Sequence, residues 1–329
     1  MDFHIEFTPK KIKPPIRHSD QLLLIGSCFT EQMGNKLIDH KFRVFQNPNG
    51  ILFNPISIAN AITSYADKKE YSADDLFLYN ELWSSWQHHS RFSGMDQDTV
   101  LQQINTSQAL AAKALAESDW LFVTLGSAFV YENEKIGSRL FSNNVVANCH
   151  KIPTDKFARR LLGFAEVEEA LHIILTKSFE VNPEMKVVFT ISPVRHLREG
   201  FIENNRSKAT LIQAVHNVVN DTTVHYFPAY ELIIDDLRDY RFYAEDMVHP
   251  NYSATNYVWE KFMKTCIDED AQNLMKEVAA IKSAVDHKPF NPSSEQHRKF
   301  KTSFLQKIHE LQINHAYLNF DREREFLQR

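Results

Sequence analysis

A serine directly follows the first predicted strand, and at that position its hydroxyl can act as a nucleophile. The apolar run Gln21 to Ile25 stops at Gly26, and Ser27 comes next, ahead of a helical pattern. Developing negative charge is favoured at such a helix N-terminus. Serine is equally a good N-cap, so capping is the competing interpretation. The neighbouring Cys28 is a rival nucleophile, since a thiol beside a helix N-terminus can have a lowered pKa, or it fills the core.

Far along the chain, an aspartate and a histidine lie within one helical turn of each other. Asp246 and His249 belong to an Asp-x-x-His-Pro stretch that follows the fifth predicted strand. At this spacing a carboxylate can fix the imidazole tautomer and stabilise the imidazolium that forms when the base accepts a proton. A capping aspartate beside a surface histidine is the alternative. With Ser27, these residues supply the three roles of nucleophilic acyl transfer.

Strands and helices alternate between these motifs. Short apolar runs ended by Gly, Pro, Asn or Ser predict strands at Gln21–Ile25, Phe42–Phe45, Trp120–Leu125, Lys186–Ile191 and Thr222–Phe227. Helical spacing covers 29–39, 99–116, 167–179, 208–219 and 252–265, and a further helix starts at Pro55. This α/β pattern predicts a parallel sheet of about five strands, covered on both faces. Chemistry in such sheets gathers at the carboxyl ends of the strands, which the polar motifs follow.

Several motifs together resemble one protein family. Beyond Gly26-Ser27-Cys28-Phe29-Thr30 they are Asn54-Pro55, Leu125-Gly126-Ser127, Asn148-Cys149-His150-Lys151, Ser192-Pro193-Val194-Arg195-His196 and Tyr240-Arg241-Phe242-Tyr243. They resemble the GSCFA family, which looks like a branch of the SGNH/GDSL hydrolases, over about Leu22 to Phe262. The resemblance implies a flavodoxin-like, doubly wound sheet and a triad acting on ester bonds. In that triad Ser27 is the nucleophile, His249 the base and Asp246 the residue that orients it.

The chain departs from the superfamily pattern at the oxyanion site. Gly50, after the second strand, matches the oxyanion glycine in placement, but Gly126 is followed by Ser127-Ala128-Phe129 instead of the expected asparagine. One donor is therefore unassigned, and losing such a donor typically costs roughly a hundred- to thousandfold in rate. Asn148, after an apparent hairpin at 135–147, is our first candidate, with a turn asparagine as the alternative. Asn54 is the next candidate.

Other polar groups are expected near the same edge. Arg195 can bind a substrate carboxylate or phosphate, or pair with an acidic loop residue. His196 is a rival base, although Asp246 favours His249. His89 is a further substrate-binding candidate in an aromatic and histidine-rich stretch, which either lines a sugar or acyl pocket or packs on the sheet. That stretch contains Trp83, Trp86, His88, His89, Ser90, Arg91 and Phe92.

The composition narrows the class of protein. The 329 residues carry a formal charge of -5, which argues against a nucleic-acid binder, and 43% are apolar, enough for a sizeable core. No segment has the length of a membrane helix, and the polar N-terminus lacks the pattern of a secretory signal. The odd, low count of 3 cysteines indicates a reducing compartment. We therefore expect a cytoplasmic protein without membrane or nucleic-acid partners.

The prediction is a hydrolase domain over residues 1–268 with a helical extension over 269–329, broken near Pro289 and Pro292. It is a serine esterase for a small or carbohydrate-linked ester, needing neither cofactor nor metal, or an acyltransferase using the same acyl-enzyme. A non-catalytic carbohydrate- or peptide-binding module is the alternative from another class. Metal-dependent hydrolysis through His88, His150 or His196 is a third, although no ligand spacing supports it. The oligomeric state stays open.

Overall fold

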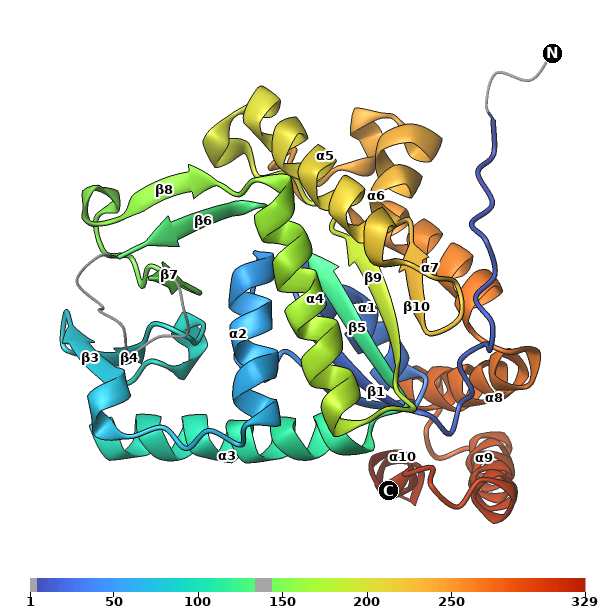
Figure 1. The fold of residues 1–329 in the computed structure, drawn as a ribbon. Coiled ribbons are helices and arrows are strands. Elements are labelled where there is room, and N and C mark those ends of the chain that lie inside the picture. Colours follow the sequence, from blue (N-terminus) through green and yellow to red (C-terminus); the bar gives the residue numbers. More distant parts are fainter. Residues whose placement is uncertain (1–4, 134–143, 329) are drawn as a thin grey trace.

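Five parallel strands form the centre of the fold, which we describe from a computed structural model over residues 5–133 and 144–328 (Figure 1). The strands are β1 (Gln21–Gly26), β2 (Arg43–Gln46), β5 (Trp120–Leu125), β9 (Lys186–Ile191) and β10 (Val224–Phe227). Their order across the sheet is β2-β1-β5-β9-β10, with every neighbouring pair parallel. This is the flavodoxin-like, doubly wound order. The fold class and all five strands predicted from the sequence are confirmed.

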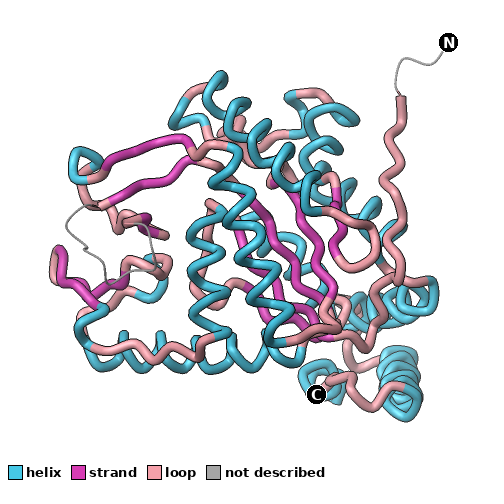
Figure 2. The backbone as a smooth tube through the Cα atoms, viewed as in Figure 1, coloured by secondary structure: helices cyan, strands magenta, loops and turns pink. Residues whose placement is uncertain are grey.

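Helices cover both faces of this sheet (Figure 2). Strand residues alternate between the two cores: Leu23 and Ile25 of β1 face one, and Leu22 and Leu24 the other. One face carries α2 (Pro55–Ala66), α4 (Phe164–Val181), α5 (Phe201–Val218) and the end of α3 (Gln97–Glu117). The other carries α1 (Cys28–Asp39), α7 (Tyr252–Cys266), the start of α8 (Glu269–Asp286), and the short α6 (Ala229–Glu231) with a π-helical turn at Leu232–Leu237.

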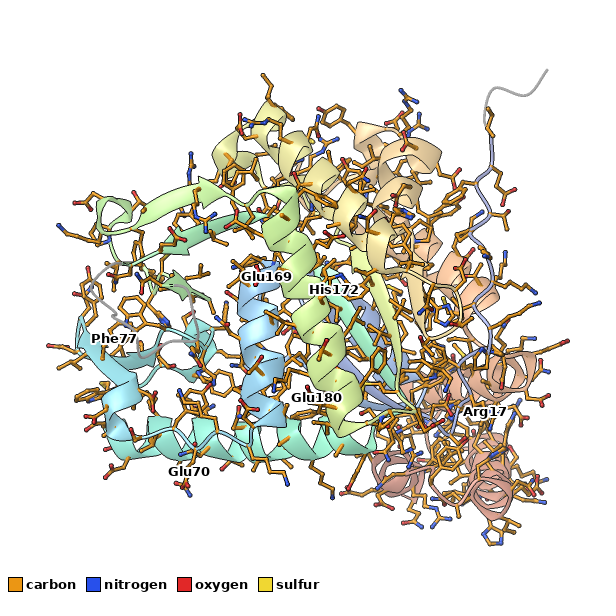
Figure 3. All side chains as sticks on the ribbon, viewed as in Figure 1. Arg17, Glu70, Phe77, Glu169, His172 and Glu180 are labelled. Atoms are coloured by element: carbon orange, nitrogen blue, oxygen red, sulfur yellow. The ribbon has the colours of Figure 1, made fainter. Side chains whose placement is uncertain are left out.

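Helix α4 shows why the apolar spacing predicts these elements. Val167, Leu171 and Ile174 recur every three or four residues and are fully buried against the sheet. The opposite side is polar, and Figure 3 shows Glu169, His172 and Glu180 along the exposed length of the helix. A helix with this stripe can bury its apolar face only by packing on a neighbouring layer.

Two small antiparallel sheets lie outside this arrangement, beyond α2 in Figure 1. The β3 (Leu76–Tyr79) and β4 (Leu82–Ser85) strands form a hairpin, and β6 (Phe129–Glu132) lies between β7 (Val145–Val146) and β8 (Ala158–Leu161). Most of the hairpin expected at 135–147 falls on residues 134–143, outside the described residues. The sheet of β6, β7 and β8 follows β5 at the carboxyl edge of the central sheet, and the loop after β4 reaches the same edge, where the His89 N–H donates to the Asn49 carbonyl.

The chain ends in helices α8, α9 (Glu295–Asn314) and α10 (Asp321–Gln328). Apolar residues of all three share one small core with Leu318 and Phe320. The ion pairs Lys282–Asp39 (2.7 Å) and Lys41–Glu323 (2.6 Å) connect this region to both ends of the α1–β2 connection. The division of domains at residue 268 stays a prediction. Among the described helices, none has the length and apolar character needed to cross a bilayer.

Candidate active site

Ser27 lies at the junction between β1 and α1. Gly26 has φ +146°, and a side chain there would collide with the backbone of Thr124 on β5, so glycine is required for this turn. The Ser27 N–H donates to the Thr124 carbonyl at 3.2 Å, and Ser27 Oγ accepts the N–H of Phe29 at 3.3 Å. Ser27 therefore caps α1, as the competing interpretation of its position predicted. Its side chain is fully buried.

Asp246 and His249 form a hydrogen-bonded pair. Oδ2 of Asp246 lies 2.7 Å from Nδ1 of His249, while Oδ1 accepts the backbone N–H groups of Val248 (2.9 Å) and His249 (3.0 Å). These bonds, first the one from the His249 backbone, lower the pKa of Asp246 to about 2. An ionised carboxylate only accepts, so Nδ1 must donate, and Nε2 of the neutral ring is left as the acceptor. The His249 side chain is 42% exposed and the Asp246 side chain is 50% exposed.

The loops that carry these groups share the carboxyl edge of the sheet. The Arg195 N–H, after β9, donates to the carbonyl of Val248 at 3.1 Å, which ties the Asp246–His249 loop to the end of β9. His196 lies against Gly126 at the end of β5, where an added Cβ would be 3.2 Å from its Nε2. Because β5 is paired with β1, which ends at Gly26, both halves of the predicted triad are on one sheet edge.

The two predicted oxyanion residues after β2 are both engaged within the fold. Gly50 has φ +76°, and its N–H donates to the carbonyl of Asn47 at 2.8 Å. Asn54 caps α2, with Oδ1 accepting the N–H of Ser57 at 2.8 Å and Nδ2 donating to Ser57 Oγ at 3.0 Å. Like the N–H of Ser27, these donors have protein acceptors in this conformation. The sequence could not reveal this, because each contact depends on the turn that its loop adopts.

His89 reaches this edge from the loop after β4. A side chain on Gly50 would collide with its Cβ, and its backbone N–H donates to the Asn49 carbonyl at 2.8 Å. Nδ1 accepts the N–H of Arg91 at 3.2 Å, and burial lowers the pKa of His89. Arg91 continues to the first turn of α1, where it pairs with Glu31 at 2.5 Å. The aromatic stretch therefore contacts the helix that Ser27 caps. No pattern in the sequence predicted this contact.

Arg195 and His196 follow β9, as predicted. The Arg195 guanidinium lies over the rings of Tyr243 (4.0 Å) and Tyr240 (4.9 Å), both in the motif that precedes Asp246. His196 is largely buried, and this burial lowers its pKa to about 3, with the charges of Lys208 and His249 acting in the same direction. A group that accepts a proton so poorly is a weak general base near neutral pH. His249, unlike His196, has a carboxylate oxygen 2.7 Å from Nδ1 that orients its ring.

Asn148 lines a cavity of about 590 Å³ beside the edge, together with Phe53, Asn54, Ser127, His196, Arg198 and others. Its Oδ1 accepts the N–H of His150 at 2.7 Å, which is the contact of a turn asparagine. The cavity is nevertheless shared with Ser127 and His196, the residues that follow the ends of β5 and β9. Its wall also contains the rings of Phe129 and Tyr131 on β6.

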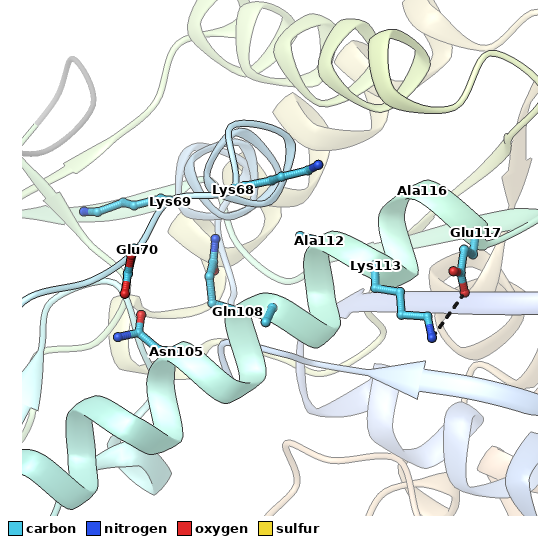
Figure 4. A pocket seen from close by; sticks show the side chains of 10 residues that line it. Lys68, Lys69, Glu70, Asn105, Gln108, Ala112, Lys113, Ala116 and Glu117 are labelled. Atoms are coloured by element: carbon cyan, nitrogen blue, oxygen red, sulfur yellow. Dashed lines mark ion pairs between the residues drawn. The ribbon is translucent and has the colours of Figure 1, made fainter.

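A second cavity, of about 510 Å³, lies between the segment Lys68–Glu70 and helix α3, where Lys113 pairs with Glu117 at 4.0 Å (Figure 4). Helix α2 begins after β2 at the carboxyl edge and ends at Ala66, just before this segment. The cavity is therefore near the opposite edge of the sheet, away from Ser27.

The remaining members of the aromatic stretch contact one another within the outer sheets. Trp86 is stacked on Phe77 at 3.8 Å, and His88 Nδ1 lies 2.9 Å from Ser85 Oγ. His150 Nε2 is 2.9 Å from the carbonyl of the same Ser85. These contacts favour the interpretation in which the aromatic stretch packs within the fold instead of lining a pocket. Over residues 5–133 and 144–328, no group of three or more His, Cys, Asp and Glu side chains is placed to hold a metal ion.

The rival nucleophile Cys28 is partly buried at the start of α1. Burial raises the pKa of its thiol above the ordinary value, which disfavours the thiolate. Since the thiolate is the reactive form, this environment favours the core-filling interpretation of Cys28.

Sequence reasoning missed one buried cation at this edge. Lys208 of α5 is 1% exposed, and its Nζ donates to the carbonyls of Gly126 (2.6 Å) and Ser192 (2.7 Å). A lysine in a helix usually extends its ammonium into water, so its residue type gave no signal of burial.

Comparison with known families identifies the class of protein. The model of the GSCFA family matches residues 21–262, so the chain belongs to the GSCFA family. The model of the GSCFA domain protein, C-terminal domain, matches residues 278–329. No curated protein matches the chain.

Among solved structures, the chain is similar to a carbohydrate esterase family 3 from Talaromyces cellulolyticus. The identity is 8%, the TM-score is 0.38, and the match covers 78% of this chain and 99% of that one.

Proposed function

We propose that the protein is a serine esterase that acts on a small or carbohydrate-linked ester. The observation that carries this proposal is the Asp246–His249 pair, on the sheet edge where Ser27 heads α1. The pair has an ionised carboxylate 2.7 Å from Nδ1 of the imidazole. This is the arrangement that orients a histidine as general base for a serine.

In the proposed reaction, Ser27 Oγ attacks the acyl carbon and His249 Nε2 accepts its proton. The ester C–O bond then breaks, and the leaving alcohol takes that proton from His249. Water attacks the acyl-enzyme, gives up its proton to His249, and releases the carboxylic acid with Ser27 restored. The N-terminal end of α1 favours the negative charge on the acyl oxygen. An acyltransferase would follow the same steps with an alcohol in place of water.

The cavity beside the edge is suited to hold the rest of the substrate. Its aromatic rings and polar side chains are the groups that bind sugars, and its volume of about 590 Å³ is in the range of ligand pockets. Because Ser27 is fully buried, we expect the groups that cover it to move before an ester reaches Oγ.

The burial and capping of Ser27 favour a second candidate, a non-catalytic module that binds a carbohydrate or peptide. In that case the cavity would bind its ligand without any acyl-enzyme. The two candidates differ in one property, which is the reactivity of the Ser27 hydroxyl.

Steady-state hydrolysis of a generic acetyl ester tests the proposal. Ser27→Ala and His249→Ala should each lower kcat by about a thousandfold or more, because each removes one role of acyl transfer. Cys28→Ala is the matched control and should keep most of the activity, with circular dichroism to check the fold. Loss of activity in Cys28→Ala but not in Ser27→Ala would make the protein a cysteine enzyme. Absence of hydrolysis by the wild type would leave the binding module.

A further inference from the structure

The buried lysine of α5 joins the ends of the two strands at the centre of the sheet. Lys208 Nζ donates to the carbonyl of Gly126, the first residue after β5, and to that of Ser192, the first residue after β9. The bonds are 2.6 and 2.7 Å long, and the side chain is fully buried. Within the described part of the chain, its ammonium makes no ion pair with a carboxylate. The hydrogen bonds of the ammonium therefore go to backbone carbonyls.

Two further groups of the same edge lie around Lys208. Its ammonium lies 5.8 Å from the centre of the Tyr230 ring on α6. Burial, and after it the charge of Lys208, lowers the pKa of His196, after β9. Burial in turn lowers the pKa of Lys208 to about 7.

Two neighbours on α5 support the same loops. Ser207 Oγ accepts the N–H of Ala128 at 2.7 Å, and Asn204 Oδ1 accepts the N–H of His196 at 2.9 Å. The inner face of this helix therefore carries polar residues toward the loops after β5 and β9. Burying a lysine without a carboxylate partner costs stability, and an apolar side chain of similar size is often the more stable choice. Such a cost suggests a role other than packing.

We propose that Lys208 is a positioning residue of the candidate site, which fixes the loops after β5 and β9. The inference rests on the proposed esterase function. Loops that are fixed in advance hold the groups at the sheet edge in the geometry of the transition state, without rearrangement during the reaction. Lys208 also lies beside Gly126, the residue after which the chain lacks the oxyanion asparagine expected from the SGNH resemblance.

The first test compares two buried lysines. Lys208→Met should lower kcat by about ten- to a hundredfold with KM within about twofold. The melting temperature is measured in parallel, because the exchange removes a buried charge and also leaves the carbonyls of Gly126 and Ser192 without their donor. Lys261→Met is the matched control: that lysine of α7 is 5% exposed and bonds Glu6 and Phe7 instead of the sheet edge. It should keep its kcat. An unchanged kcat in Lys208→Met, with an active wild type, would overturn the inference.

The second readout does not depend on hydrolysis. We would follow hydrogen–deuterium exchange of the loops after β5 and β9, with peptide mapping to separate them from the rest of the chain. Loss of the two Lys208 bonds should speed exchange in residues 126–129 and 192–196 of Lys208→Met but not of Lys261→Met. If the wild type hydrolyses no ester, the proposed function fails and exchange alone decides, unchanged exchange overturning the inference. If Lys208→Met does not fold, Lys208→Gln, which keeps an amide donor, takes its place.

Discussion

Single contacts decide which polar residues at the sheet edge can do chemistry. Asp246 is held ionised by three hydrogen bonds from the next turn, so it can orient His249 over the whole neutral range. His196, a few residues after β9, is kept neutral by burial and cannot serve as well. The two histidines at this edge therefore differ in their surroundings, and this difference is why we propose His249 as the base.

Asn148 is our first candidate for the missing oxyanion donor. Its Oδ1 is bonded to the His150 N–H, which leaves the amide nitrogen as a donor toward the cavity that Ser127 and His196 also line. We predict that Asn148→Ala lowers turnover of an acetyl ester by roughly two to three orders of magnitude with the fold intact. Asn220→Ala, which removes a turn asparagine beside β10, is the control and should leave turnover unchanged. Full turnover in Asn148→Ala would show that the turn contact is its whole role.

The site residues that the sequence made visible are those whose spacing is local. Asp246 and His249 are three positions apart, and Ser27 follows an apolar run, so their roles could be predicted without a fold. The Arg91–Glu31 pair and the Lys208 bonds join residues that are far apart in the chain. Such contacts become visible only when the layers are assembled.

At the scale of elements, side-chain caps fix where three of the helices begin. Asn54, Asp96 and Asn251 each accept a backbone N–H three residues on, at the starts of α2, α3 and α7. The start of α2 lies at the carboxyl edge and lines the cavity, so its cap is also placed to affect the site.

Replacing two of these caps separates stability from catalysis. Asn54→Ala and Asp96→Ala should each lower the free energy of unfolding by about 1 kcal/mol, because each leaves a helix N–H without its acceptor. Urea denaturation measures this. With both side-chain atoms of Asn54 engaged by Ser57, turnover per folded molecule should be unchanged in both variants. A hundredfold loss in Asn54→Ala alone would instead make Asn54 the missing oxyanion donor.

The sequence predicted the central strands well and some element boundaries poorly, for physical reasons. Each buried strand is an apolar run with a turn residue at its end, as in Trp120–Leu125. Helix α5 was expected from Lys208 but starts at Phe201, because its first turns bury the polar residues Asn204 and Ser207, which break the apolar period. The outer strands β6 and β8 are short, mix polar and apolar residues, and pair across a long separation, so they were not predicted.

At the scale of the whole molecule, the fold places histidines where they cannot take up a proton easily. Burial lowers the pKa values of His88 and His196 to about 3, from the ordinary value of 6.5. These histidines lie in different parts of the fold, one in the outer hairpin region and one at the end of β9. The stability of the molecule is therefore linked to pH through its core.

The sign of this linkage follows from proton binding. Between pH 6.5 and 3 the unfolded chain protonates both histidines while the folded chain does not, so the free energy of unfolding should fall as the pH drops. The expected loss is about 2 kcal/mol per histidine at pH 5. His88→Gln, in the outer hairpin region, should reduce the dependence of the free energy of unfolding on pH, measured by urea denaturation at pH 7 and pH 5. An equal slope in the variant and the wild type would contradict the assigned pKa of His88.

The most direct test of the central claim is covalent labelling with a fluorophosphonate probe, since only an activated serine hydroxyl reacts with it. We predict one adduct per chain, located at Ser27 by peptide mass spectrometry and absent from Ser27→Ala. His249→Ala, which lacks the base, should label at least about a hundredfold more slowly. A wild-type protein left unlabelled under conditions that label a known serine hydrolase, or labelled at another residue, would contradict the proposal that Ser27 is a catalytic nucleophile.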